Sequence, residues 1–115
     1  MKVSDIRPFI PSKDYQTSIE FYSDLEFSSD YVTDDLTLFE NGNCTFFLQR
    51  FYNQQLCENL MFQMCVVDIE STFKVANSAR HKQKITAIEN ERWGKVFYLW
   101  GPSGELWHVT QLARQ

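Results

Sequence analysis

The sequence predicts an α+β fold in which two βαβββ units follow one another within a single domain, residues 1–115. Three observations support this prediction. The residues from Asp14 to Ile19 are matched in pattern, 54 positions later, by those from Asp68 to Phe73. The dipeptides Asn41-Gly42 and Ser103-Gly104 mark final hairpins in equivalent places. A chain of 115 residues also has room for only one hydrophobic core, so we expect two curved mixed sheets around a cavity, with the helices outside.

The first unit is expected to cover residues 3–50. It begins with an edge strand at 6–11, because the prolines in this run keep the residues before them out of the helical region. Asp14 can then cap a helix that ends near Asp24. Three short strands complete the unit, at 27–32, 36–40 and 44–50.

Residues 51–59 interrupt this pattern and are interpreted as a connector. The second unit, residues 60–112, repeats the order of the first. Asp68 is expected to cap its helix, in which Ile69, Phe73 and Ala76 share one face. Its strands are expected at 60–67, 84–88, 96–100 and 106–110.

The last two strands form a hairpin around the turn from Gly101 to Gly104. Because side chains alternate along a strand, one face should carry core residues, namely Phe97, Leu99, Trp107 and Val109. The other face combines large aromatics with an imidazole, and its members are Tyr98, Trp100, Leu106, His108 and Thr110. A hydrophobic wall with few polar groups suits a small-molecule pocket, although a second buried face of a two-layer core would show the same pattern.

Composition and charge exclude several classes of function. The net charge is −4, and no Lys or Arg occurs from Asp14 to Gln49. Nucleic-acid binding needs a concentrated basic surface, whereas the basic cluster of Arg80, Lys82 and Lys84 lies where the end of a helix favours cations. No apolar run is close to the length of about 20 residues that spans a membrane, so we expect a cytoplasmic protein that binds neither membrane nor nucleic acid. The three cysteines lack the spacing of a zinc site and are interpreted as reduced thiols.

Three stretches mark the two ends of the first helix and the last hairpin: Phe9 to Asp14, Phe21 to Phe27, and Gly101 to Trp107. In this order they resemble the vicinal oxygen chelate superfamily of glyoxalases, extradiol dioxygenases and bleomycin-resistance proteins. The resemblance covers nearly the whole chain and implies the tandem βαβββ fold. Glu26 and Gly101 stand where the family usually has Gly and Asp, at positions that affect turns more than chemistry.

In the metal-dependent enzymes of this superfamily four inward positions hold the ion, and the resemblance places them on Arg7, Phe46, Met61 and His108. Only His108 is a normal ligand for a divalent metal, whereas an open catalytic site needs about three such ligands. We therefore expect no metal cofactor. A metal-dependent glyoxalase-type or dioxygenase-type enzyme with atypical ligands is kept as the alternative.

Within the superfamily the likeness is greatest to the bleomycin-resistance proteins, which are dimers that sequester a cationic drug without modifying it. It rests on the acidic strand from Phe27 to Asp35, on the loop Arg92-Trp93-Gly94, and on His108. The resemblance implies that Trp93 stacks on a flat ligand, with Leu36 at the opposing position and Asp30 near the ligand's charge. Taken alone, Asp30 is also explained as solvated surface and His108 as a satisfied, half-buried histidine.

We expect a homodimer that binds a small, cationic aromatic molecule and sequesters it, as in antibiotic resistance. Sequestration needs no nucleophile, base or cofactor, and the sequence offers no convincing set of them. The candidate ligand contacts are Trp93, Asp30, Leu36, Tyr98, Trp100, His108, Phe46, Met61 and Arg7. Tyr98 and Trp100 would instead meet a helix or a partner subunit if the register slipped by one residue. A protein-interaction module whose cavity is closed by side chains is a third alternative.

Overall fold

The computed structural model describes residues 1–113, and the two βαβββ units occur in the predicted order. The first unit comprises β1 (Phe9–Pro11), α1 (Tyr15–Asp24), β2 (Ser28–Thr33), β3 (Leu36–Asn41) and β4 (Cys44–Gln49). The second comprises β5 (Met61–Cys65), α3 (Ile69–Ser78), β6 (Lys84–Ile85), β7 (Glu89–Glu91), β8 (Gly94–Trp100) and β9 (Leu106–Leu112). A short helix, α2 (Gln54–Asn59), connects them. The predicted α+β class is confirmed. No helix among residues 1–113 is long and apolar enough to cross a membrane.

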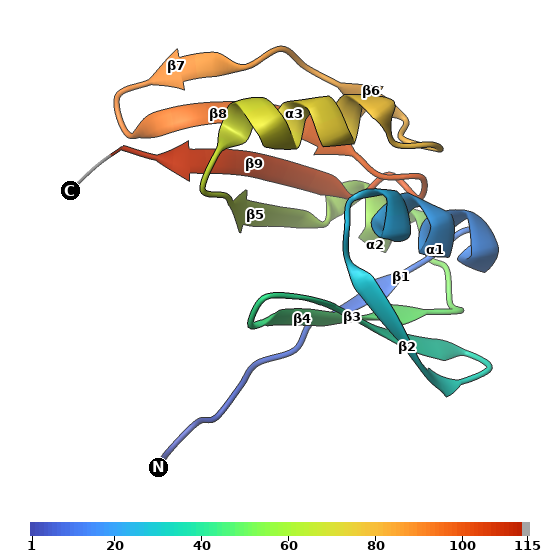
Figure 1. Cartoon of the computed structure of the whole chain (residues 1–115). Coiled ribbons are helices and arrows are strands. Elements are labelled where there is room, and N and C mark those ends of the chain that lie inside the picture. Colours follow the sequence, from blue (N-terminus) through green and yellow to red (C-terminus); the bar gives the residue numbers. More distant parts are fainter. Residues whose placement is uncertain (114–115) are drawn as a thin grey trace.

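Each unit contributes one mixed sheet, and the two sheets share one topology (Figure 1). The first sheet has the order β1-β4-β3-β2, and the second has the order β5-β9-β8-β6, with β7 also paired to β8. In each sheet the first strand of the unit runs parallel to its last strand, and the other pairs are antiparallel. This repeated arrangement is the one that the sequence pattern predicts.

Both long helices begin at the predicted aspartates. Asp14 accepts a hydrogen bond from the backbone N–H of Thr17 at 3.0 Å. Asp68 accepts from the backbone N–H groups of Glu70 and Ser71. These bonds satisfy N–H groups that have no partner inside the helix, which is why an aspartate starts the helix in each unit.

The connector contains a helix that the sequence analysis missed. Asn53 caps α2 by accepting a hydrogen bond from the backbone N–H of Leu56 at 2.9 Å, and Cys57 within the helix is fully buried. A helix of six residues is too short to show a clear apolar period, so the polar composition of this segment masked it.

Two edge strands are shorter than predicted. β1 begins at Phe9, and residues 1–8 are exposed and belong to no strand. The strand predicted at 84–88 is replaced by β6 and β7, which pair with successive parts of β8. Between them the backbone N–H of Tyr98 donates to the hydroxyl of Thr86 at 2.8 Å, so a side chain takes the place of a backbone acceptor and interrupts the ladder.

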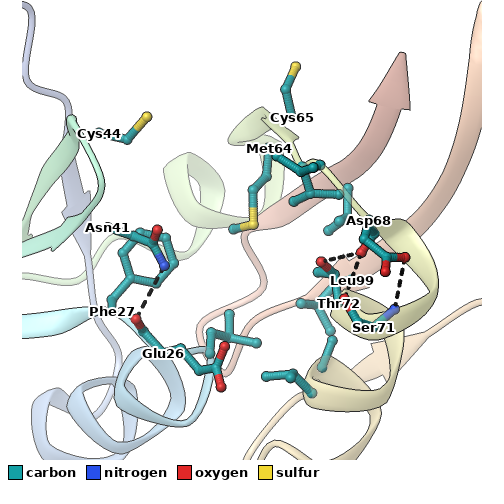
Figure 2. Close-up of a pocket in the computed structure, with 16 residues that line it drawn as sticks. Glu26, Phe27, Asn41, Cys44, Met64, Cys65, Asp68, Ser71, Thr72 and Leu99 are labelled. Atoms are coloured by element: carbon teal, nitrogen blue, oxygen red, sulfur yellow. Dashed lines mark hydrogen bonds between the residues drawn. The ribbon is translucent and has the colours of Figure 1, made fainter. Parts of the chain in front are cut away.

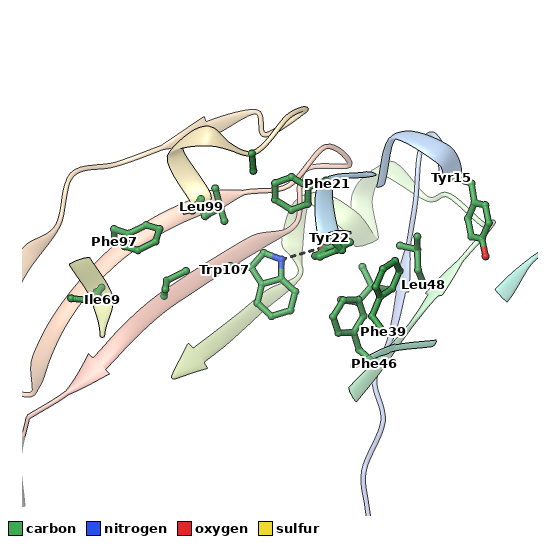
Figure 3. Packing of buried hydrophobic residues seen from close by; sticks show 14 residues of the cluster. Tyr15, Phe21, Tyr22, Phe39, Phe46, Leu48, Ile69, Phe97, Leu99 and Trp107 are labelled. Carbon is green, nitrogen blue, oxygen red and sulfur yellow. Dashed lines mark hydrogen bonds between the residues drawn. The ribbon is translucent and has the colours of Figure 1, made fainter. Parts of the chain in front are cut away.

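Side chains from both units form one hydrophobic core (Figure 3). Tyr22 of α1 lies at its centre, with ring centroids 4.9 Å from Phe46 of β4 and 6.0 Å from Trp107 of β9. The indole N–H of Trp107 also donates a hydrogen bond to the Tyr22 hydroxyl at 3.1 Å. Because α1 also contacts α3, the two units join through the sides of their sheets that carry the helices.

The predicted alternation in the final hairpin is confirmed by the strand register, but Thr110, which shares the face of His108, is fully buried. The core face is buried, and its members are Phe97, Leu99, Trp107 and Val109. Tyr98, Trp100 and His108 lie half-buried on the opposite face. We call the sides of the two sheets that point away from the shared core the open faces.

Candidate functional site

The second open face carries four of the nine predicted ligand contacts, namely Met61, Tyr98, Trp100 and His108. Cross-strand register places on it Met61, Gln63, Tyr98, Trp100, Leu106 and His108. The Tyr98 ring meets the His108 imidazole edge-on, with ring centroids 4.9 Å apart and an interplanar angle of 88°. The centroid of the Tyr98 ring also lies 6.4 Å from the centroid of the Trp100 ring. The face therefore offers aromatic surface with one central polar ring, which is the composition of a small-molecule platform.

His108 has a hydrogen-bonding atom that the protein does not satisfy. Its Nε2 is buried and has no hydrogen-bond partner among the described residues. Gln63 lies opposite His108 in the adjacent strand, where its side-chain oxygen accepts a weak bond from the Cys65 thiol at 3.6 Å. A buried polar atom without a partner is costly, so Nε2 is the least satisfied polar atom described on this face.

The basic cluster near this face is accounted for by contacts within the chain. The Lys82 ammonium donates to the backbone carbonyls of Asn77 and Ala79 at the end of α3, which agrees with the helix-end interpretation. Lys84 lies over the Trp100 ring, with its Nζ 5.1 Å from the centroid. One face of Trp100 is thus already covered by a cation of the protein.

The first open face is aromatic at its centre and acidic at its edge. Cross-strand register places on it Phe9, Asp30, Leu36, Leu38 and Phe47. The rings of Phe9 and Phe47 stack with centroids 4.7 Å apart, and the Arg7 guanidinium lies 5.9 Å from the Phe47 centroid. Arg7 also pairs with Asp5 at 3.0 Å. Three predicted contacts, Arg7, Asp30 and Leu36, are therefore brought to this sheet.

Trp93 lies in the turn between β7 and β8 and is 44% exposed. The next residue must be glycine, because a Cβ on Gly94 would lie 2.3 Å from the backbone oxygen of Gln111 in β9. A strand rises about 3.3 Å per residue, so Trp93 is separated from Tyr98 by about 16 Å along the hairpin. Within one chain, the predicted stacking residue and the Tyr98–His108 pair do not meet.

Phe46 belongs to neither open face, and its predicted ligand contact is corrected by the structure. It is 4% exposed and its ring stacks on Phe39 with centroids 5.5 Å apart. Alternation along β4 turns Phe47 toward the open side and Phe46 toward α1. The residue of β4 that faces the open side is Phe47, one position further along the chain.

The four positions that the resemblance assigns to a metal do not combine into a metal site. Phe46 is in the core, the Arg7 guanidinium is a cation, and Met61 offers only a thioether that is largely exposed. Among residues 1–113, no group of three or more His, Cys, Asp or Glu side chains could hold a metal ion. The donor set therefore does not fit a catalytic metal.

A pocket of about 550 Å³ lies elsewhere, at the seam between the two units (Figure 2). Its walls come from the end of α1, the hairpin of β3 and β4, the end of β5 and one side of α3. None of the predicted ligand contacts lines it. Its lining residues, both apolar and polar, are brought together from distant parts of the chain, so the sequence carried no signal for it.

Glu105 is a buried carboxyl group that the sequence analysis also missed. Its two oxygens accept hydrogen bonds from the Tyr22 hydroxyl at 2.6 Å and from the backbone N–H of Ser103 at 2.9 Å. Burial raises the pKa of Glu105, and these two hydrogen bonds oppose the increase only in part. Gly101 makes room for the group, because a Cβ at that position would lie 2.5 Å from the carboxyl carbon. Glu105 thus ties the last hairpin to α1 and is closed to ligands.

No protein-family model and no curated protein sequence matches this chain, but several solved structures share its fold. A bleomycin resistance determinant encoded on the transposon Tn5 matches with a TM-score of 0.80 and 18% identity, over 97% of this chain and 100% of that one. A bleomycin-binding protein from bleomycin-producing Streptomyces verticillus, complexed with copper(II)-bleomycin, matches with a TM-score of 0.80 and 18% identity, over 98% and 99%. An antibiotic binding protein from Streptomyces sp. CB03234 matches with a TM-score of 0.80 and 15% identity, over 98% and 99%. The chain therefore has the fold of the bleomycin-resistance proteins of the vicinal oxygen chelate superfamily.

Proposed function

We propose that this protein binds and sequesters a small organic molecule, in the manner of an antibiotic-binding resistance protein. The observation that carries the proposal is the second open face, where Tyr98, Trp100 and His108 present half-buried rings that contact one another. The likeness in fold to proteins described as bleomycin-binding and antibiotic binding supports the same role. Binding of this kind needs shape and polarity but no nucleophile or metal.

The binding sites would lie between two copies of the chain. The two units join through their helix sides, so neither open face is covered by the other unit. Phe9 on the first open face is 50% exposed and Met61 on the second is 63% exposed. A homodimer in which the acidic first face of one copy meets the aromatic second face of the other would cover both surfaces and form two equivalent sites.

The ligand class that suits these faces is a planar aromatic cation. The segment from Asp14 to Gln49 carries no Lys or Arg, and Asp30 is exposed on the first open face. Trp93 is exposed enough to stack on a ring, whereas Trp100 already lies under Lys84. Stacking with cation–π attraction contributes about 0.5 to 2 kcal/mol, and screened attraction to carboxylates adds mainly to the association rate.

The ligand proposal is tested by titrating the intrinsic tryptophan fluorescence with bleomycin, with the cation 9-aminoacridine and with its neutral isostere acridine near neutral pH. We expect the cation to bind more tightly than acridine. Trp93→Ala should weaken binding by about tenfold, because it removes the stacking surface. Asp30→Asn should weaken binding only at low salt, because its contribution is screened.

A matched control for Asp30→Asn is Glu58→Gln, which removes the same charge from α2, away from both open faces. If acridine binds as tightly as 9-aminoacridine, or if Trp93→Ala leaves every affinity unchanged, the proposed ligand class is wrong.

Two further measurements address the dimer and the enzyme alternative. Light scattering at micromolar concentration should give twice the chain mass of 13.6 kDa, and a monomer mass would contradict the shared sites. Elemental analysis of protein purified without chelator should find no stoichiometric zinc, manganese, nickel or iron. A stoichiometric metal would favour a metal-dependent enzyme with atypical ligands.

A further inference from the structure

The pocket at the seam between the two units is a gap in the shared core. On its floor are Ala76, Leu99 and Val109, which are almost fully buried. Its walls include half-buried apolar side chains that also pack against the core, namely Leu25, Phe27, Met64 and Val66. The volume of about 550 Å³ lies within the range of small-molecule sites, which is about 300 to 1,000 Å³.

Several polar groups at the rim are already engaged with one another (Figure 2). The Asn41 amide donates to the backbone oxygen of Glu26 at 3.2 Å. The Asp68 carboxylate caps α3, and the hydroxyls of Ser71 and Thr72 donate to the Asp68 backbone oxygen at 3.1 and 2.9 Å. The pocket therefore offers a ligand much apolar surface and few free hydrogen-bonding groups.

The charge at the rim selects further among ligands. Glu26 and Asp68 are both acidic, and the described lining residues include no Lys or Arg. An anion would be repelled here, and a cation would find its partner only at the exposed rim. A neutral molecule with an apolar body is neither repelled by the acidic rim nor penalised by loss of hydration in the apolar interior.

We propose that the pocket bounded by Phe27, Met64, Val75 and Leu99 is a second ligand site, which takes a neutral, mainly apolar molecule of about two or three rings. It lies mainly on the helix sides of the sheets, and among its lining residues Cys65, at the end of β5, has the parity of the second open face. None of the predicted ligand contacts lines it, so it is independent of the proposed sequestration of an aromatic cation. Because an apolar cavity of this size loses contacts when it is empty, an occupant should also stabilise the folded chain.

The test uses the neutral apolar fluorophore N-phenyl-1-naphthylamine. We expect its emission to rise on binding to the wild type with one site per chain. Val75→Phe places a larger side chain in the pocket and should weaken binding by about tenfold or more. Asn77→Phe adds the same ring to an exposed position of α3 outside the pocket, and should leave binding unchanged. Trp100→Ala, on the second open face, should also leave it unchanged.

A second measurement locates the probe through thiol labelling. The exposed Cys44 and Cys65 are replaced by Ser, while the buried Cys57 stays in place. In this background, Thr72→Cys puts a thiol on the pocket wall and Asn77→Cys puts one on the solvent side of the same helix. N-phenyl-1-naphthylamine should slow alkylation by N-ethylmaleimide at position 72 and not at 77. This readout does not depend on Val75→Phe folding correctly.

Several outcomes would overturn the proposal. One is the absence of saturable binding, and another is equal protection of positions 72 and 77. Loss of binding in Trp100→Ala but not in Val75→Phe would assign the probe to the open face. Protection of position 72 without any probe, growing with protein concentration, would show that a second copy of the chain fills the pocket. The acridine titrations are unaffected by any of these results, so the two sites are judged separately.

Discussion

Trp107 and Trp100 lie on opposite faces of the same hairpin, and their surroundings show how differently its two sides are used. Trp107 is 6% exposed, stacks on Phe62 with centroids 4.9 Å apart and donates a hydrogen bond to Tyr22. Trp100 is half-buried and lies under Lys84. Around Trp107 the helix side of the sheet is thus closed within one chain, whereas the open side still presents surface to another molecule.

The core between the two units is likewise tightly packed at one end and open at the other. Toward β9, Tyr22 links the two units through a ring contact with Trp107 and a hydrogen bond to Glu105. Near the start of α3, the units are separated by the pocket instead. Stability should therefore depend on the aromatic end of the seam, and ligand binding on the other end and on the open faces.

The largest expected effect separates the two tryptophans. Trp107→Ala should lower the free energy of unfolding by about 3 to 5 kcal/mol, because it leaves a cavity in the core. Trp100→Ala should cost about 1 kcal/mol or less, because the side chain is only partly buried. Urea unfolding followed by far-ultraviolet circular dichroism measures both values. Similar losses for the two variants would show that the open face is as important to stability as the core.

The next effect compares two glycines, one required by a close contact and the other by a positive φ. Gly101→Ala should cost about 1 to 3 kcal/mol, because the new Cβ would collide with the Glu105 carboxyl group. A Cβ at Gly42 would meet open space, and the only obstacle is a φ of 60°. Gly42→Ala should therefore lower the free energy of unfolding by about 1 kcal/mol. In a Glu105→Ala background the cost of Gly101→Ala should shrink, and additive losses in that double-mutant cycle would argue against the contact.

A smaller effect depends on pH. Burial raises the pKa of Glu105 above its unfolded value, so the stabilisation from its neutral form is complete below about pH 4.3 and is lost as the pH rises through the raised pKa. Glu105→Gln mimics the neutral carboxyl and does not ionise. Its unfolding midpoint in urea should therefore fall less than that of the wild type as the pH increases. If the unfolding midpoints of the wild type and of Glu105→Gln changed in parallel with pH, ionisation of Glu105 would cost the folded protein no stability.

The smallest effect is expected at the surface ion pair that joins the units. Arg80 contacts Asp24 at 2.9 Å and holds the pKa of that carboxyl below its usual range, but the Arg80 side chain is 59% exposed. Arg80→Gln should lower the unfolding midpoint slightly at low salt and not at high salt. Arg92→Gln, which removes the same charge from the turn before Gly94, is the control. A loss that persists at high salt would indicate a packing role for Arg80.

Much of the fold could be predicted because it is encoded in local patterns. The aspartates that start α1 and α3, the glycine turns and the alternation in β8 and β9 each depend on neighbours within a few residues. The predictions that differed from the structure concern segments with weak sequence patterns. α2 is short and polar, and the strand expected at 84–88 is interrupted by the Thr86 hydroxyl.

The candidate site could be predicted only in part. The pairing of Tyr98 with His108 followed from alternation, and the structure brings the two rings together. Phe46 was placed by resemblance one residue away from Phe47, which is the ring on the open face. Trp93 lies in the turn between β7 and β8, at the far end of the hairpin from the Tyr98–Trp100 pair.

By itself, the sequence determined the two repeated units, their helix starts and the two faces of the final hairpin, because spacing and turn residues act over short distances. Only the tertiary structure decided that the units join through their helix sides and leave a pocket at one end of the seam. It also decided that Glu105 meets Tyr22, a partner 83 positions away. Contacts of this kind depend on how two separately patterned sheets pack, and no local period records that packing.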